Sequence, residues 1–168
     1  QSTVYMCAER YGRVYVLKRL KNTRDFTREF KALHCIPQHP NVLTYFKDVV
    51  TQPMELAYPC GVCDAMEFVV QRGGLNGTAL LRKWTAQLTT ALAHCHAHGV
   101  VHWDIKPDNV IVHSTQAQPT SYAQWLHRQK CVLSSTDTAE DAHKAYDLNV
   151  TVSDFAYAVV GVSPTHTA

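Results

Sequence analysis

A short polar stretch between two apolar runs carries the side chains best suited to chemistry. It reads V-H-W-D-I-K-P-D-N-V over residues 101–110 and places Asp104, Lys106 and Asn109 in one loop. An aspartate can accept a proton, a lysine can neutralise a phosphoryl oxygen, and an amide oxygen can bind a hard metal ion. Phosphoryl transfer needs these three capacities together, because its catalysis is mostly positioning and charge neutralisation.

Two separate segments supply further charges that fit the same chemistry. Asp154 opens the run D-F-A directly after an apolar stretch, and Mg²⁺ prefers carboxylate ligands of this kind. Lys18 ends another apolar stretch, and an ion pair with Glu29 would hold its ammonium group in place for phosphate binding. Taken singly, each of these side chains is more typical of a solvated strand end, helix surface or loop cap. Only their combination favours one shared site.

The spacing of apolar residues predicts the elements that must position these groups. Alternating residues predict a strand hairpin that ends at Lys18, with its turn at residues 10–13. Helical spacing predicts a helix over residues 25–36, which Pro37 and Pro40 stop. Further β-type runs predict strands at residues 42–50, 65–70, 100–101, 110–112 and 150–152.

The second half of the chain begins with a predicted long helix. The flexible break at residues 72–77 precedes it, and Gly99 is suited to cap its C-terminus. Its apolar stripe consists of Leu81, Trp84, Leu88, Leu92 and Cys95. Residues 114–148 are rich in Ser, Thr, Gln and Asp, and we interpret them as an insertion that is partly helical around residues 122–129. This order predicts a small sheet-rich lobe joined to a helical lobe.

Composition excludes several classes of protein. The chain has 168 residues, of which 46% are hydrophobic, and its net charge of +2 is too small to favour nucleic acid or membrane as the main partner. The first residues lack the order of a signal peptide, so we expect a cytoplasmic or nuclear protein. We expect the six cysteines to be reduced, and the lone C-x-x-C at Cys60 and Cys63 is a weak zinc signal.

Taken in order, these motifs resemble those of a eukaryotic-type serine/threonine protein kinase domain. Residues 102–109, H-W-D-I-K-P-D-N, resemble the catalytic loop H-R-D-L-x-x-x-N. The run V-Y-V-L-K ending at Lys18 resembles the V-A-I-K strand. Glu29, followed by H-P-N-V at residues 39–42, resembles the family's αC helix and the turn behind it. The run A-M-E-F-V at residues 65–69 is similar to the hinge between the lobes.

The resemblance implies an α+β, two-lobed fold of the protein-kinase type, with a β-rich N-lobe and a partial helical C-lobe. The N-lobe would span residues 1–70, as a five-stranded sheet plus the αC helix, with the hinge at 66–74. The partial C-lobe would span residues 75–168, with the catalytic loop at 102–109, the insertion at 114–148 and the start of the activation segment at 154–168. We expect a chain truncated at both ends, and expect this piece alone not to phosphorylate a protein.

The resemblance also implies a role for each charged residue of the motifs. Asp104 would accept or orient the proton of the substrate hydroxyl, and Lys106 would steady the γ-phosphate of ATP. Asn109 and Asp154 would hold Mg²⁺. Lys106, two positions after Asp104, follows the serine/threonine-kinase pattern.

Nucleotide binding would involve both lobes. Lys18 would contact the α- and β-phosphates of ATP and form a structural ion pair with Glu29. The adenine ring would lie between Val4, Val16 and Ile111. Met66 would be the gatekeeper side chain, with backbone groups for adenine offered by Glu67 and Val69. The side chains expected to stack as an internal hydrophobic spine are His102, Phe155 and Leu33.

Departures from the family pattern leave more than one function open. Trp103 replaces the usual arginine of the catalytic loop, Ala156 replaces the glycine after D-F, and Val16 is larger than the usual alanine. The expected function is an ATP-dependent serine/threonine protein kinase with a protein substrate and no identified regulatory partner. The alternative is a pseudokinase, or a truncated kinase-like fragment, acting as a binding or scaffold module. A small-molecule phosphotransferase fits less well, because Lys106-Pro107 is typical of enzymes with protein substrates.

Overall fold

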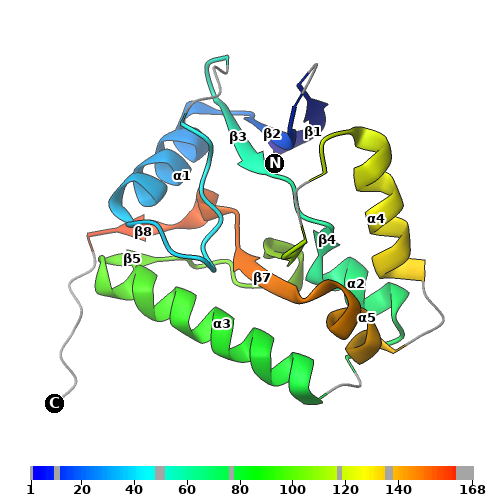
Figure 1. The fold of residues 1–168 in the computed structure, drawn as a ribbon. Coiled ribbons are helices and arrows are strands. Elements are labelled where there is room, and N and C mark those ends of the chain that lie inside the picture. Colours follow the sequence, from blue (N-terminus) through cyan, green and yellow to red (C-terminus); the bar gives the residue numbers. More distant parts are fainter. Residues whose placement is uncertain are drawn as a thin grey trace, which may run out of the picture.

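The N-terminal part of the molecule is a twisted antiparallel sheet with the order β1-β2-β3. Its strands are β1 (Ser2–Ala8), β2 (Val14–Leu20) and β3 (Glu55–Pro59) (Figure 1). The hairpin predicted to end near Lys18 is confirmed, with Val4 paired to Lys18. The computed structural model describes residues 2–9, 12–47, 52–75, 78–116, 119–134 and 138–161. The hairpin turn predicted at 10–13 and the activation segment predicted at 154–168 therefore lie partly outside the described residues.

Helix α1 (Thr23–Cys35) confirms the helix predicted at 25–36. It begins where the side chain of Asn22 accepts a hydrogen bond from the backbone N–H of Asp25, which satisfies one of the free donors of the first turn. Its buried face carries Glu29 and Leu33. A carboxylate on the buried face of a helix requires a partner, because an isolated buried charge is costly.

The C-terminal part is built around a second antiparallel sheet with the order β4-β6-β7. Its strands are β4 (Cys63–Asp64), β6 (Val110–Ser114) and β7 (Leu148–Val152). A separate two-stranded pair consists of β5 (Val100–Val101) and β8 (Val159–Val160). The strands predicted at 100–101, 110–112 and 150–152 are thus confirmed.

Helix α3 (Thr78–Ala97) runs beneath this sheet and confirms the predicted long helix (Figure 1). Gly99 follows it with a positive φ of 70°, a conformation that glycine adopts without strain. The predicted stripe is wrong at its start: Leu80 is fully buried, whereas Leu81 is 47% exposed. None of the helices in the described part of the chain has the length and apolar character needed to span a bilayer.

Two predicted strands are wrong, so the five-stranded N-terminal sheet is wrong for the described residues. Residues 65–70 belong to helix α2 (Ala65–Gln71), which Asp64 caps by accepting a hydrogen bond from the N–H of Glu67. Ala65 and Phe68 are buried at helical spacing, and this packing outweighs the strand preference of two adjacent valines. The described part of 42–50 forms only an isolated bridge from Val42 to Val152, and residues 48–50 lie outside the description.

The insertion is largely helical, more so than the sequence predicted. It contains α4 (Tyr122–Ser134) and α5 (Ala139–Tyr146) between the paired strands β6 and β7. A reciprocal capping box between Thr138 and Asp141 begins α5. The last pair of the β6–β7 ladder joins Ser114 to Leu148, so the insertion leaves and rejoins the sheet at neighbouring positions.

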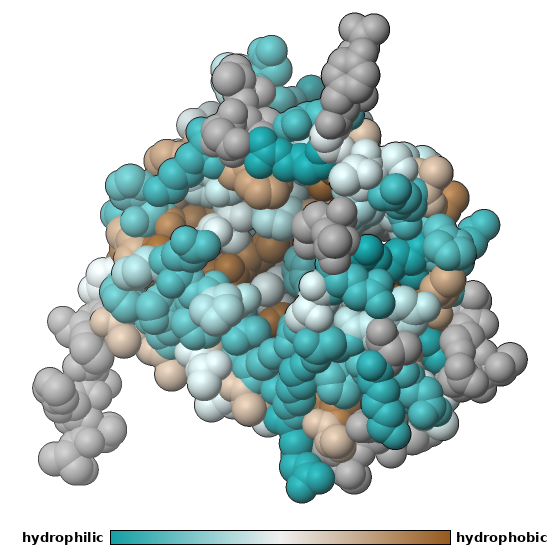
Figure 2. Space-filling view, in the orientation of Figure 1, coloured by the Kyte–Doolittle hydropathy of each residue, from teal (hydrophilic) through white to brown (hydrophobic). Residues whose placement is uncertain are grey.

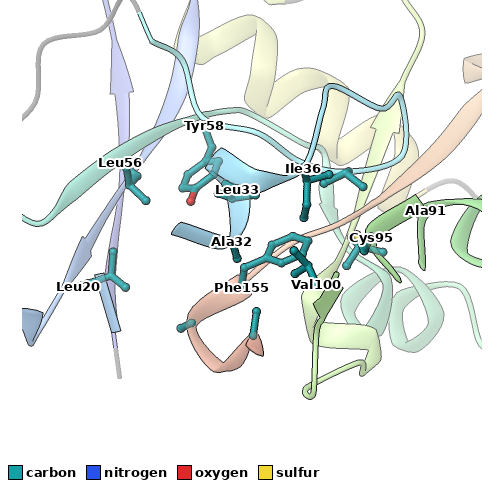
Figure 3. Close-up of a cluster of buried hydrophobic side chains, with 14 residues drawn as sticks. Leu20, Ala32, Leu33, Ile36, Leu56, Tyr58, Ala91, Cys95, Val100 and Phe155 are labelled. Atoms are coloured by element: carbon teal, nitrogen blue, oxygen red, sulfur yellow. The ribbon is translucent and has the colours of Figure 1, made fainter. Parts of the chain in front are cut away.

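Two hydrophobic clusters hold the fold together. The first joins α1, β3 and α3 around Phe155, which is fully buried (Figure 3). The second gathers α2, α3, β6, β7 and the insertion around Phe68 and Trp84. Figure 2 shows hydrophobic residues recessed behind a mainly hydrophilic rim on the face that it presents. All six cysteines are free thiols in the structure, as expected.

Candidate functional site

Lys18 lies at the centre of a largely buried ion-pair network. Its Nζ donates hydrogen bonds to both carboxylate oxygens of Glu29, at 2.9 and 2.7 Å, and to Oδ1 of Asp154 at 2.8 Å. Strand β2 supplies the lysine, α1 the glutamate and the segment after β7 the aspartate. The structure therefore brings together three charged residues that the sequence singled out, although Lys18 and Asp154 are 136 positions apart.

Tyr58 is a member of this network that the sequence analysis missed. Its hydroxyl donates a hydrogen bond to Oε1 of Glu29 at 2.7 Å. Burial raises the pKa of Glu29, while Lys18 and the Tyr58 hydroxyl act in the opposite direction. Burial and the nearby Glu29 carboxylate raise the pKa of Tyr58 well above its usual value, so the phenol is a neutral donor. The available signal was E-L-A-Y-P at residues 55–59, a short strand-like run before a proline.

Asp104, Lys106 and Asn109 form a second charged group. Oδ2 of Asp104 lies 2.9 Å from Nζ of Lys106 and accepts a hydrogen bond from Nδ2 of Asn109 at 2.9 Å. The hydrogen bond from Lys106 holds the pKa of Asp104 below its usual value, so this carboxylate is ionised at neutral pH. Nδ2 of Asn109 also donates to the backbone oxygen of Asp104 at 2.8 Å. The amide nitrogen is committed to the loop, which leaves the amide oxygen of Asn109 as its metal-binding atom.

His102 connects the two charged groups. The backbone N–H of Asp104 donates to Nδ1 of His102, so Nε2 carries the proton and donates to the backbone oxygen of Ser153 at 2.8 Å. Burial lowers the pKa of His102, which favours this neutral form. Its ring meets Phe155 edge-on, with centroids 4.6 Å apart, and Leu33 lies in the same buried cluster as Phe155. This arrangement fixes the loop before Asp104 against the segment that carries Asp154.

Two of the four described non-glycine residues with a positive φ lie at this site. Trp103 and Asp154 have φ values of 66° and 62°, in the left-handed region that residues other than glycine rarely adopt. Such conformations persist where the surroundings impose them, and they cluster at active sites and ligand clamps. The Trp103 side chain is 72% exposed, so burial of its ring does not compensate for the strain.

Two adjoining cavities lie beside the charged groups. The first has a volume of about 210 Å³, and apolar side chains of Val4, Val16 and Ile111 line it. The second has a volume of about 340 Å³, and the charged side chains of Asp104 and Lys106 contribute to its lining. The residues that line both cavities are Ser2, Lys18 and Asp154. This division suits a ligand with a flat apolar ring at one end and a charged tail at the other.

The structure corrects the predicted hinge. Met66, Glu67 and Val69 lie on helix α2 and are absent from the described lining of the first cavity, and Met66 is 41% exposed. The end of β3 and the segment that follows it provide that wall instead. The residues of this wall are Tyr58 and Pro59 at the end of β3, and Gly61 after it. The prediction is wrong because the strand that enters the hinge was expected at 65–70, whereas it is β3.

The oxygen ligands at the site suit magnesium better than zinc. Asn109 and Asp154 both line the first cavity, and the Asp154 side chain is 33% exposed. Within the described ranges, no group of three or more His, Cys, Asp or Glu residues is placed to hold a metal. Magnesium is commonly held by one or two carboxylates together with phosphate oxygens and water. Asn109 and Asp154 are therefore enough as protein ligands for it. Burial raises the pKa of the Cys60 thiol to about 12, so this thiol is protonated at neutral pH in the metal-free protein.

Comparison with known proteins finds a matching family and several similar sequences. The sequence profile of the family described as protein kinase domain matches residues 1–127. CDPK-related kinase 1 of Arabidopsis thaliana is 32% identical over 92 residues, which cover 52% of this chain and 16% of the relative. CBL-interacting protein kinase 22 of Oryza sativa subsp. japonica is 34% identical over 93 residues, which cover 52% of this chain and 20% of the relative.

A solved structure is similar in fold over most of the chain. The crystal structure of the Rad53 kinase domain and SCD2 superimposes with a TM-score of 0.65 over 94% of this chain and 49% of that chain, at 22% identity. Serine/threonine-protein kinase RAD53 of Saccharomyces cerevisiae is 30% identical over 98 residues, covering 56% of this chain and 12% of that protein. The chain thus spans about half of the solved kinase structure and a smaller share of these curated relatives.

Proposed function

The chain belongs to the protein kinase domain family, and from that premise we propose that it is the catalytic core of an ATP-dependent serine/threonine protein kinase. The reaction would transfer the γ-phosphate of ATP to a Ser or Thr hydroxyl of a protein substrate. The observation that carries the proposal is the Lys18 network, which joins Glu29 and Asp154 at the boundary between an apolar and a charged cavity. As part of the same proposal, the protein acts in the cytoplasm or nucleus, where ATP is abundant.

In this mechanism the first cavity receives the adenine ring. Val4, Val16 and Ile111 line this cavity, so the ring would be removed from water between apolar surfaces. The Lys18 ammonium neutralises phosphate oxygens, and its bonds to Glu29 hold it in position before the nucleotide arrives. A pre-positioned cation stabilises developing charge without a reorganisation cost during the reaction.

The second cavity supplies the groups for transfer. Asp104 is ionised and can accept or orient the proton of the attacking hydroxyl. Lys106 lies 2.9 Å from Asp104 and can contact the γ-phosphate on its way to the substrate. When bound, Mg²⁺ would neutralise phosphate charge, with Asn109 and Asp154 as its protein ligands.

Nucleotide binding by the purified chain tests the first half of the proposal. ATP with Mg²⁺ at 100 times its dissociation constant would stabilise the protein by about 2.7 kcal/mol. The melting temperature would then rise by about 5 to 10 °C. Asp154→Asn should remove the magnesium dependence of this rise. The matched control is Asp147→Asn, the same chemical change at an exposed carboxylate remote from both cavities. Absence of any rise in the unaltered chain would refute the proposal.

Phosphate transfer tests the second half and is measured in a protein that contains this chain. With a generic basic protein as acceptor, Asp104→Asn should lower the transfer rate by about 10² to 10⁴-fold, the usual contribution of a positioned acid or base. The affinity for ATP should stay unchanged, because Asp104 lies outside the apolar cavity. Nucleotide binding without transfer would favour the second candidate function, a non-catalytic binding module. The observation that favours this candidate is Trp103, which stands where the family's catalytic loop has an arginine.

A further inference from the structure

The insertion contacts the wall of the proposed adenine pocket through one hydrogen bond. Nε1 of Trp125, on α4, donates to the backbone oxygen of Gly61 at 2.8 Å across 64 positions of sequence. Gly61 lies in the segment between β3 and β4 and lines the first cavity. Trp125 itself is absent from the described lining of that cavity, so it approaches Gly61 from outside.

The peptide group between Gly61 and Val62 is therefore held at both of its polar ends. Its carbonyl accepts the hydrogen bond from Trp125, and its N–H donates to the backbone oxygen of Val112 on β6 at 2.8 Å. A glycine has no side chain to restrict its backbone, so the orientation of this peptide depends on its hydrogen bonds. The N–H is held by the sheet, whereas the carbonyl accepts the 2.8 Å bond from the insertion and a weaker 3.4 Å bond from Sγ of the adjacent Cys60.

Helix α4 is anchored firmly enough to transmit this restraint. Val132, two turns beyond Trp125, is fully buried in the cluster around Phe68 and Trp84. Nε of Arg72, at the C-terminal end of α2, donates to the backbone oxygen of Val132 at 2.7 Å. The helix is thus fixed to the C-terminal part of the molecule while its Trp125 reaches the segment that leads from the N-terminal sheet.

We propose that Trp125 is a positioning residue for nucleotide binding, through which the insertion fixes the orientation of the Gly61–Val62 peptide in the pocket wall. This inference rests on the proposed function. Loss of the indole N–H would leave the carbonyl with the weaker Cys60 bond, so the peptide would be less firmly oriented and the nucleotide would have to order it on binding. A net hydrogen bond corresponds to about a two- to tenfold change in an equilibrium constant, so we expect ATP binding to weaken by about that factor.

The test uses Trp125→Phe, which keeps an aromatic ring and removes only the donor and the second ring. Its matched control is Trp84→Phe, which removes a weaker 3.4 Å indole bond to the backbone of Leu148 elsewhere in the same part of the molecule. Calorimetric titration with ATP and Mg²⁺ should give a higher dissociation constant for Trp125→Phe and an unchanged one for the control. In a protein that catalyses transfer, KM for ATP should rise while kcat stays constant. Equal affinities in the unaltered and Trp125→Phe proteins would overturn the proposal, as would the same loss in the control.

Hydrogen exchange separates this inference from the proposed function. In the nucleotide-free protein, the Val62 amide should exchange faster in Trp125→Phe than in the unaltered chain, while the amides of α3 keep their protection. This measurement needs no ligand. A Val62 amide that stays equally protected would refute the positioning role, whatever the nucleotide titrations give. Faster exchange in a chain that binds no nucleotide would show that Trp125 restrains the peptide, but would refute the proposed function and with it the role of Trp125 in nucleotide binding.

Discussion

Replacing Lys18 by methionine tests the buried network most directly. Methionine matches the length of the lysine stem but carries no charge, so the change removes the partner of two carboxylates. Asp154 is one-third exposed, and water can solvate it after the change. Glu29 is 1% exposed, and of its hydrogen bonds within the described part of the chain the one from the Tyr58 hydroxyl remains. The destabilisation should therefore come almost entirely from Glu29.

The size of the effect follows from that burial. Removing one partner of a buried ion pair typically destabilises a protein by about 3 to 5 kcal/mol. For a chain of this size, each kcal/mol lowers the melting temperature by about 2 to 4 °C, so a fall of about 6 to 20 °C is expected. Adding Glu29→Gln should recover a large part of the loss, because a neutral amide still accepts the Tyr58 hydrogen bond and leaves no unpaired charge.

The pH dependence identifies the cause. Burial places the folded-state pKa of Glu29 above its usual 4.5, and Lys18→Met removes the main group that lowers it. A raised pKa means that ionisation of Glu29 opposes folding, so the destabilisation is absent below pH 4.5 and grows as the pH rises through the folded-state pKa. Urea unfolding at pH 5 and pH 8, followed by circular dichroism, should give a larger difference between the two proteins at pH 8. Equal differences at both pH values, or no recovery in the double variant, would refute the reasoning.

Two further substitutions test neighbouring contacts. Tyr58→Phe should destabilise the chain by about 1.5 to 3 kcal/mol in urea unfolding, because it removes a hydrogen bond to a buried carboxylate, and a value near zero would mean that water replaces the hydroxyl. Gly61→Ala should cost about 1 to 3 kcal/mol, because the new Cβ would lie 2.2 Å from Cγ2 of Ile111 and 2.9 Å from the Val112 oxygen. That cost should shrink in an Ile111→Ala background, and an undiminished cost there would point away from the clash with Ile111.

The charged residues of the site could be identified from the sequence because they occur in a recognisable order of motifs. That order can be read without knowing how far apart the residues lie in the folded protein. Lys18, Glu29, Asp104 and Asp154 each stand in a motif whose flanking residues restrict its local structure. The motifs could not predict Tyr58, the hydrogen-bond partner of Glu29, because Tyr58 belongs to no motif. Tyr58 lies in an ordinary apolar strand, and only the tertiary pairing of β2 with β3 places its hydroxyl against Glu29.

The errors in the predicted fold occur in short segments whose secondary structure is determined by tertiary packing. The run A-M-E-F-V-V has strand-forming residues and a helical spacing of its buried positions, and burial of Ala65 and Phe68 selects the helix. β3 was overlooked because its apolar run is short and ends at Pro59. Both errors displaced the expected hinge by a few residues, which is why Met66, Glu67 and Val69 were assigned to the pocket in place of the segment around Gly61.

The close spacing of the insertion's two ends has a practical consequence for protein engineering. Since Ser114 and Leu148 face each other across the last rung of a ladder, a two-residue turn has the span to join β6 to β7 directly. Excising both helices would expose the apolar surface that Val132 covers, so a shortened protein would require polar replacements there to avoid aggregation. Conversely, a foreign domain whose ends lie close together could be inserted between these two residues without separating β6 from β7.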